Sequence, residues 1–312
     1  MNKLLLSVGS IVAAVLAAQT GEVEITVASG EKTLAQALAD EAKTLGPTDD
    51  LVKLGAGKLD IGALPEYGGN IHIKAGVVHA SATNAFGLAT GYTKVYDGAQ
   101  LQTYTNAEKT LSFGDEQFII EGTGPDGKGA IRCLSTAQQS SIVSPLGKKL
   151  TLTGNALITD TVRHDLFGTT DLGGHTLTLK GGSFYFENSV TTNGNVIASG
   201  GVVVFPTQCS FPGDASNVFT LTNNAQFYFC WSVLSKVFWT LDVADGYFQL
   251  SVDSQDNLWN GPVILRKMTS FQGGNNAATF ATVRFPKKVT GDGGFNMKGN
   301  YQELRLGSPE ND

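Results

Sequence analysis

Short stretches that alternate apolar and polar residues fill most of the chain. Residues 51–81 read LVKLGAGKLDIGALPEYGGNIHIKAGVVHAS, where the alternating runs KLDI and IHIK are separated by glycines. Because successive side chains of a strand point to opposite faces, each run predicts a short strand with one buried and one solvated face. Further runs of this kind lie at 149–154, 175–182, 183–188, 194–206, 217–223, 225–231, 246–253, 278–286 and 301–307.

One segment near the N-terminus has helical rather than alternating spacing. The segment EKTLAQALADEAKTL (31–45) follows an alternating run, EVEITVAS (22–29), and is stopped by a Gly-Pro pair. We expect this strand and helix to cap one end of a stack of β layers, because an exposed end invites edge pairing and aggregation. The apolar residues of the helix are Leu34, Leu38, Ala42 and Leu45.

The spacing between corresponding strand positions favours a solenoid. Phe184, Val204, Phe227 and Phe248 follow one another at intervals of 20, 23 and 21 residues. An irregular period of about 20 to 25 residues is typical of one coil of a β-solenoid, whose coils stack by parallel pairing. The alternative is an antiparallel β-sandwich, for which Asn193-Gly194 is a candidate hairpin turn.

Composition agrees with an all-β protein and argues against nucleic acid as a partner. The 312 residues include 38 glycines, and only 16% of the residues are charged. The net charge is −6, and no block of lysine or arginine occurs. Nucleic-acid binding depends on neutralising phosphates with a basic surface, so we expect no nucleic-acid partner.

The N-terminus has the layout of a secretory signal peptide. Lys3 precedes an apolar run at 4–16, and the small residues Ala17 and Ala18 follow. We expect cleavage near Ala18, a secreted protein, and no membrane span in the mature chain, where no second long apolar run occurs. The alternative is an uncleaved N-terminal anchor.

Three cysteines leave the thiol chemistry open. Cys209 and Cys230 stand 21 residues apart, which is about one coil, so stacked strands would bring them within reach of a disulfide. The alternative is that Cys133, Cys209 and Cys230 are small buried core residues, and we favour it.

The densest polar cluster is TDTVRHDLFGTTD at 159–171. Its acidic residues and its arginine could form a calcium-dependent lyase site on one exposed face, because Ca²⁺ prefers oxygen ligands. The alternative, which we favour, is a solvated loop between coils. We predict no catalytic residue, metal site or cofactor, because the four histidines are dispersed along the chain. The candidate binding residues are Asp160, Arg163, His164 and Asp165.

Aromatic residues late in the chain allow two interpretations. Facing outward, they would form a stacking platform for sugar rings; facing inward, they belong to the core, which we favour. These residues are Trp231, Trp239, Tyr247 and Trp259.

The segment 51–81 resembles the autotransporter-associated β-strand repeat, also called the passenger-associated transport repeat, of bacterial surface proteins. The resemblance implies a right-handed parallel β-helix that is exported and acts as an adhesin, spacer or scaffold, with a minority of members carrying an enzyme. Members usually end in a translocator barrel, whereas this chain ends in GSPEND, which leaves open whether a barrel or anchor follows Asp312. The matching residues are Lys53, Gly55, Gly57, Leu59 and Ile61, then Tyr67, Gly69, Ile71, Ile73, Gly76 and Val78.

We therefore expect a signal peptide at 1–18, an N-terminal cap at 19–50 and a right-handed parallel β-helix at 51–312. The expected function is a secreted or cell-surface structural stalk or adhesin without catalysis, with glycans or surface proteins as partners. The alternative is a carbohydrate-active β-helix enzyme, either a polysaccharide lyase or a glycosidase. An enzyme would need two or more acidic or basic groups converging on one groove.

Overall fold

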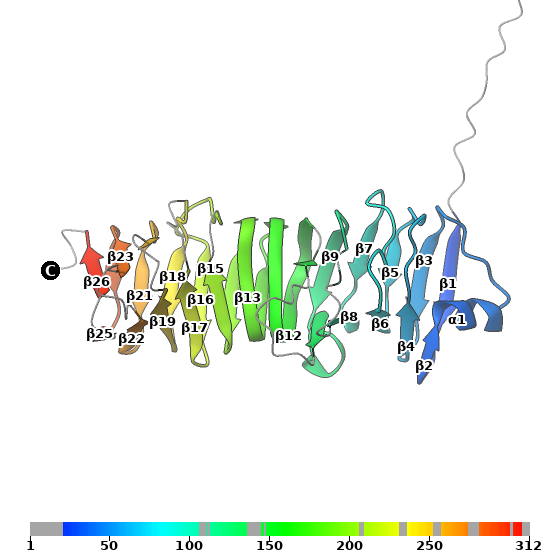
Figure 1. Cartoon of the computed structure of the whole chain (residues 1–312), viewed down its shortest axis with the longest axis horizontal. Coiled ribbons are helices and arrows are strands. Elements are labelled where there is room, and N and C mark those ends of the chain that lie inside the picture. Colours follow the sequence, from blue (N-terminus) through cyan, green and yellow to red (C-terminus); the bar gives the residue numbers. More distant parts are fainter. Residues whose placement is uncertain are drawn as a thin grey trace, which may run out of the picture.

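The chain folds into an elongated β-solenoid of about 10 turns (Figure 1). The computed structural model describes residues 21–105, 111, 113–135, 145–146, 148–205, 209–230, 236–251, 257–273, 281–299 and 302–307. Within these ranges, every pairing between named strands is parallel, for example β1 (Glu22–Thr26) with β3 (Asp50–Leu54). Parallel pairing of successive coils confirms the solenoid and excludes the antiparallel sandwich.

The N-terminal half has two strands in each coil, and these form two stacks along the solenoid. Each strand pairs with its counterpart one coil later, as β4 does with β6. The first stack is β1, β3, β5 (Ile71–Ile73), β7 (Tyr92–Val95) and β9 (Gln117–Gly122); the second is β2 (Glu31–Thr33), β4 (Lys58–Ile61), β6 (Gly76–Ala80), β8 (Ala99–Thr105) and β10 (Ile131–Ser135).

Two long strands in the middle of the chain pass around the corners of the coil and begin a third stack. They are β12 (Lys149–Asp171) and β13 (Thr176–Thr192), which pair along most of their length with shifts of register at the corners. The second stack continues as β14 (Asn195–Ser199), β16 (Val218–Thr222), β18 (Thr240–Val243), β21 (Val263–Leu265) and β24 (Val289–Thr290); the third contains β15 (Val202–Phe205), β17 (Ala225–Phe229), β19 (Gly246–Leu250), β22 (Thr269–Gly273) and β25 (Phe295–Lys298). The remaining elements are the 3₁₀ turn η1 (Pro125–Gly127), β11 (Pro145–Leu146), which pairs with β12, and the small sheet of β20 (Asn257–Leu258), β23 (Ala281–Phe285) and β26 (Gln302–Leu306).

The coil length varies more widely than the sequence spacing predicted. Corresponding residues are 19 apart between Leu177 and Val196 and 32 apart between Phe118 and Leu150. The predicted column also contained one wrong residue. Val203, not Val204, stacks between Phe184 and Phe227, because β15 is shifted by one residue relative to the expected alignment. A shift of one residue turns the side chain to the other face, so the column cannot tolerate it.

The helix α1 (Leu34–Asp40) covers the N-terminal end of the solenoid, beside β1 (Figure 1). Thr33 caps it, with its hydroxyl accepting from the Gln36 amide while the Gln36 side chain accepts from the Thr33 amide. The predicted extension to residue 45 is wrong, because the helix ends at Asp40 and Ala42 has a φ of 52°. No helix in the described ranges combines the length and hydropathy required to cross a membrane.

Aromatic rings fill the interior of the C-terminal half. Phe205 stacks on Phe186 with ring centroids 5.3 Å apart and on Phe227 at 4.4 Å. Phe248 stacks on Phe271 at 4.7 Å, which extends the ring column through the following coils. Such pairs stabilise the stack beyond their buried area, and they tie the packing of each coil to the next.

We expect Phe227→Ala to lower the free energy of unfolding by about 3–5 kcal/mol, because it leaves a cavity where rings from neighbouring coils meet. The matched control is Phe238→Ala, since Phe238 is 43% exposed and should cost less than about 1 kcal/mol. Denaturant unfolding followed by circular dichroism measures both values. Equal losses for the two variants would contradict the buried ring column.

Candidate functional site

Strand β12 places the four candidate binding residues on two opposite sides of the chain. Asp160 shares a side with Ile158, and His164 shares a side with Leu166; both of these apolar residues belong to the core. Arg163 lies on the opposite side from His164. The register shifts between Asp160 and Arg163, where the strand turns a corner. The expectation that these residues share one exposed face is therefore wrong.

Arg163 and Asp165 form a tight ion pair on the outward side of β12. The Nε and Nη2 atoms of Arg163 donate to the two carboxylate oxygens of Asp165 over 2.7 and 2.8 Å, and the guanidinium lies 3.8 Å above the Tyr185 ring. The Asp165 side chain is fully buried. Both groups are thus engaged with each other, as bidentate pairs of this kind hold a fixed geometry.

The two carboxylates proposed for a lyase or calcium site do not converge. Asp160 is turned into the coil beside His164, whereas Asp165 is held by Arg163 on the other side of the strand. A calcium ion needs several oxygen ligands around one point, and a glycosidase needs two carboxyl groups facing one groove. These residues meet neither requirement, so the carbohydrate-active alternative loses the side chains on which it depended.

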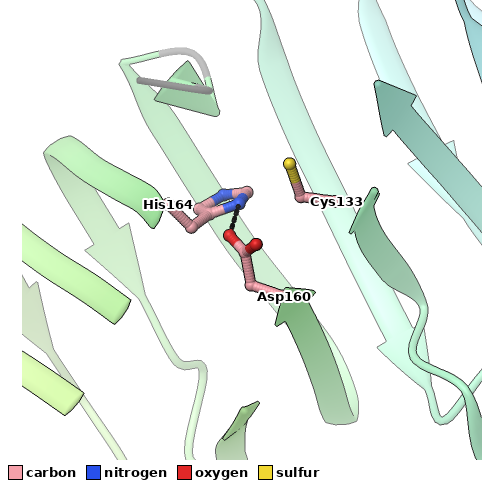
Figure 2. A group of neighbouring side chains, drawn as sticks. All are labelled: Cys133, Asp160 and His164. Carbon is pink, nitrogen blue, oxygen red and sulfur yellow. Dashed lines mark ion pairs between the residues drawn. The ribbon is translucent and has the colours of Figure 1, made fainter. Parts of the chain in front are cut away.

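The structure instead brings Asp160 and His164 together with Cys133 from β10. The Nδ1 atom of His164 lies 3.4 Å from Oδ2 of Asp160, and one ligand atom from each of the three residues lies within 4.8 Å of the other two. Figure 2 shows the thiol, the carboxylate and the imidazole close together across two strands. Cys133 and His164 have no exposed surface, and Asp160 is 6% exposed.

The electrostatics of this buried cluster favour a charged imidazole. Burial by itself lowers the pKa of His164, but the adjacent Asp160 carboxylate and Cys133 thiol outweigh it and raise the pKa to about 9. The ring also packs on Phe184, with centroids 6.0 Å apart. The interior of one coil therefore contains ionisable groups next to aromatic core.

Sequence spacing could not reveal this cluster. Cys133 and Asp160 are 27 residues apart in sequence, and they become neighbours only because β10 and β12 pair in the register that places one opposite the other. The search for a histidine with a nearby cysteine failed because it was restricted to short sequence separations. The available signal was the coil period, which would have aligned Cys133 with Asp160 had the longer coils been anticipated.

A second group of possible metal ligands lies on the surface of the second stack. Glu31, Asp60 and His79 come from β2, β4 and β6, and their ligand atoms also lie within 4.8 Å of one another. His79 Nδ1 is 3.3 Å from Asp60 Oδ2, and the Ser81 hydroxyl donates to the other carboxylate oxygen over 2.6 Å. Glu31 also pairs with Lys58 at 2.8 Å. These groups are exposed or half-buried and already have partners, as is common for surface charges.

Residues of the repeat-like segment have structural roles at the corners of the coil. The Lys53 ammonium is buried and donates to the carbonyl oxygens of Gly55 and Ala75 over 2.7 and 2.9 Å, and burial lowers its pKa to about 8. The Tyr67 hydroxyl accepts from the amide of Leu51 over 3.1 Å. A side chain at Gly69 would place its Cβ 2.0 Å from the Asp49 carbonyl oxygen, so this corner requires glycine.

The aromatic and cysteine alternatives are settled for the described residues. Trp239 and Trp259 are fully buried, which confirms the core interpretation for both, while Trp231 lies outside the described residues. The indole N–H of Trp259 donates to the Trp239 carbonyl over 2.9 Å. All three cysteines are free and buried, so no disulfide joins Cys209 and Cys230.

Another buried acid lies in the N-terminal half. Glu116 is 3% exposed, and its Oε1 atom accepts a hydrogen bond from the Thr93 hydroxyl over 2.8 Å. Burial raises the pKa of Glu116 to about 7, while the hydrogen bond from Thr93 partly opposes this shift. This carboxyl therefore destabilises the fold when it ionises.

Comparison with known proteins leaves the fold as the basis for assigning the chain to a class. The chain matches no protein-family model, and neither the curated proteins nor the solved structures gave a significant match. The class that the structure defines is that of parallel β-solenoids.

The stability of the protein should depend on pH through Glu116. Between about pH 4.5 and 7, the folded carboxyl keeps a proton that the unfolded chain has released, so the free energy of unfolding falls as the pH rises. Glu116→Gln replaces the protonated acid with a neutral amide. We expect the variant to match the wild type near pH 4.5 and to be more stable by roughly 2–3 kcal/mol at pH 8.

Urea unfolding at a series of pH values measures this difference, with Glu66→Gln at an exposed position as the control. The control should follow the wild type at every pH. A Glu116→Gln variant whose advantage does not grow between these pH values would contradict the raised pKa.

Proposed function

We propose that the chain is an exported, non-catalytic module of the passenger type that acts as a stalk or adhesin at the bacterial surface or outside the cell. The observation that carries the proposal is the uninterrupted run of parallel coils along the long axis of the molecule (Figure 1). Each coil is fixed to the next by backbone hydrogen bonds and by inward side chains. This construction gives length and a fixed spacing, which are the physical requirements of a stalk.

The repeat-like segment supports the passenger-type assignment. Lys53, Tyr67 and Gly69 each have a role at a corner of the coil that depends on the type of residue present. The buried ammonium satisfies two carbonyl oxygens, the phenol hydroxyl joins neighbouring corners, and the glycine permits close approach of the backbone. A repeat in which these residues recur at this spacing is therefore explained by stacking requirements rather than by binding of a ligand.

Export is supported by the sequence before the first strand. The basic Lys3, the apolar run at 4–16 and the small residues at Ala17 and Ala18 have the order that signal peptidase substrates require. The outward face of the solenoid would then be the surface available to glycans or surface proteins. Side chains there include charged pairs such as Arg266 with Asp242, whose donors and acceptors are 2.9 Å apart.

The export step can be tested by disrupting the apolar run. We expect a bacterial host that produces the full chain to release it from the cytoplasm and to shorten it near Ala18, whereas Leu5→Asp with Val12→Asp should leave the whole chain in the cytoplasm. Intact-mass measurement of the cytoplasmic and extracytoplasmic fractions provides the readout. The control is Leu5→Ile with Val12→Ile, which keeps the run apolar.

Retention of the unprocessed wild-type chain in the cytoplasm would overturn export. Binding of the exported chain to glycan-coated or protein-coated surfaces then separates the two forms of the proposal: an adhesin binds one of them saturably, and a stalk binds neither. Cleavage of a polysaccharide by the purified chain would instead support the enzyme alternative.

A further inference from the structure

The cluster of Cys133, Asp160 and His164 combines the sulfur, oxygen and nitrogen donors that bind transition metals. Its three ligand atoms lie within 4.8 Å of one another inside the coil. Within the described part of the chain, neither ring nitrogen of His164 has a hydrogen-bond partner of good geometry, although the side chain is fully buried. Buried polar atoms are normally satisfied, so an imidazole in this position indicates that something else binds it.

We propose that Cys133, Asp160 and His164 bind a single divalent transition-metal ion, with zinc the best fit, in the interior of the solenoid between β10 and β12. Thiolate, imidazole and carboxylate are the ligands that Zn²⁺ takes in proteins. The ion would stabilise the fold at the corner where β12 shifts register. A structural role follows from the burial of the cluster, since Cys133 and His164 have no exposed surface for a substrate to reach.

The distances agree with this assignment. Tetrahedral zinc with bonds of about 2.0–2.3 Å places neighbouring ligand atoms roughly 3.3–3.7 Å apart. The separation of 3.4 Å between His164 Nδ1 and Asp160 Oδ2 already lies in this range. The remaining separations are no greater than 4.8 Å, so small side-chain rotations would bring all three donors to one ion. A water molecule can supply the fourth ligand.

The charges also agree. A divalent ion with one thiolate, one carboxylate and a neutral imidazole forms a complex with no net charge. A neutral complex minimises the cost of placing ionised groups in an apolar interior. Phe184, in contact with the His164 ring, is part of this apolar surrounding.

Asp160 also provides a connection to the surface. It lines a hollow of about 290 Å³ together with Thr161 and Gly181. The same hollow carries Arg132 and Lys180, whose positive charges oppose the approach of a free cation. We therefore expect the ion to be incorporated most readily while the chain folds.

The test uses Co²⁺ as a spectroscopic substitute for zinc on the full chain, purified under reducing conditions and refolded at about pH 8, where ligands lose their protons more readily to the metal. We expect one equivalent of Co²⁺ to produce a thiolate-to-cobalt charge-transfer band in the near ultraviolet and tetrahedral bands in the visible. With Zn²⁺ in excess, the unfolding midpoint should rise by about 5 °C.

Cys133→Ser should abolish the charge-transfer band, and Asp160→Asn and His164→Gln should each weaken Co²⁺ binding at least tenfold. Cys209→Ser is the matched control, because Cys209 is also buried but lies outside the cluster. His79→Gln controls for the surface group of Glu31, Asp60 and His79. Both controls should retain the band and the zinc-induced shift.

Absence of the band from the refolded wild type would overturn the proposal. So would a band that persists in Cys133→Ser or is lost in Cys209→Ser, or metal binding that disappears in His79→Gln. Far-ultraviolet circular dichroism of each metal-free variant confirms that it has folded. If Cys133→Ser does not fold, Cys133→Ala replaces it, and the same loss of the band is expected.

Discussion

Parallel pairing of each coil with the next is the constraint on which the rest of this structure depends. Once two coils are in register, inward and outward positions are set for every residue of both, because side chains alternate strictly along a strand. The pairs of β14 with β16 and of β17 with β19 show that this register is maintained through coils of different length. Extra residues are accommodated in turns between strands. The variable coil period is thus compatible with a continuous interior.

A continuous interior makes every inward position costly for a polar side chain. Lys53 is accommodated by two backbone carbonyls, and Glu116 has the Thr93 hydroxyl. The cluster around His164 is different, since its ionisable groups come from two coils and their partners are mainly one another. A metal ion would satisfy these groups together, as it does in sites where ligands converge from separate strands. The interior of a solenoid can therefore contain a specific site as well as serve as packing.

The outward surface is then the part of the molecule free to vary. Ion pairs between coils, such as Arg163 with Asp165 and Arg266 with Asp242, use outward positions without disturbing the columns inside. A solenoid built in this way can change its surface chemistry from coil to coil while keeping its length and stiffness. This separation suits the stalk or adhesin that we propose, because recognition and support then depend on different residues.

The alternation of apolar and polar residues, the glycine turns and the approximate coil period were sufficient to predict a parallel β-solenoid with a helix near its N-terminal end. These features are local, or repeat at a nearly constant distance, so they can be read along the chain. The precise register was decided by tertiary packing: the third-stack column takes Val203 rather than Val204, and α1 ends at Asp40. The same packing turned Asp160 and His164 inward, away from Asp165, and placed Cys133 beside them across 27 residues of sequence. Coil lengths between 19 and 32 residues cannot be inferred from strand patterns alone, and a change of one residue reverses the direction of a side chain.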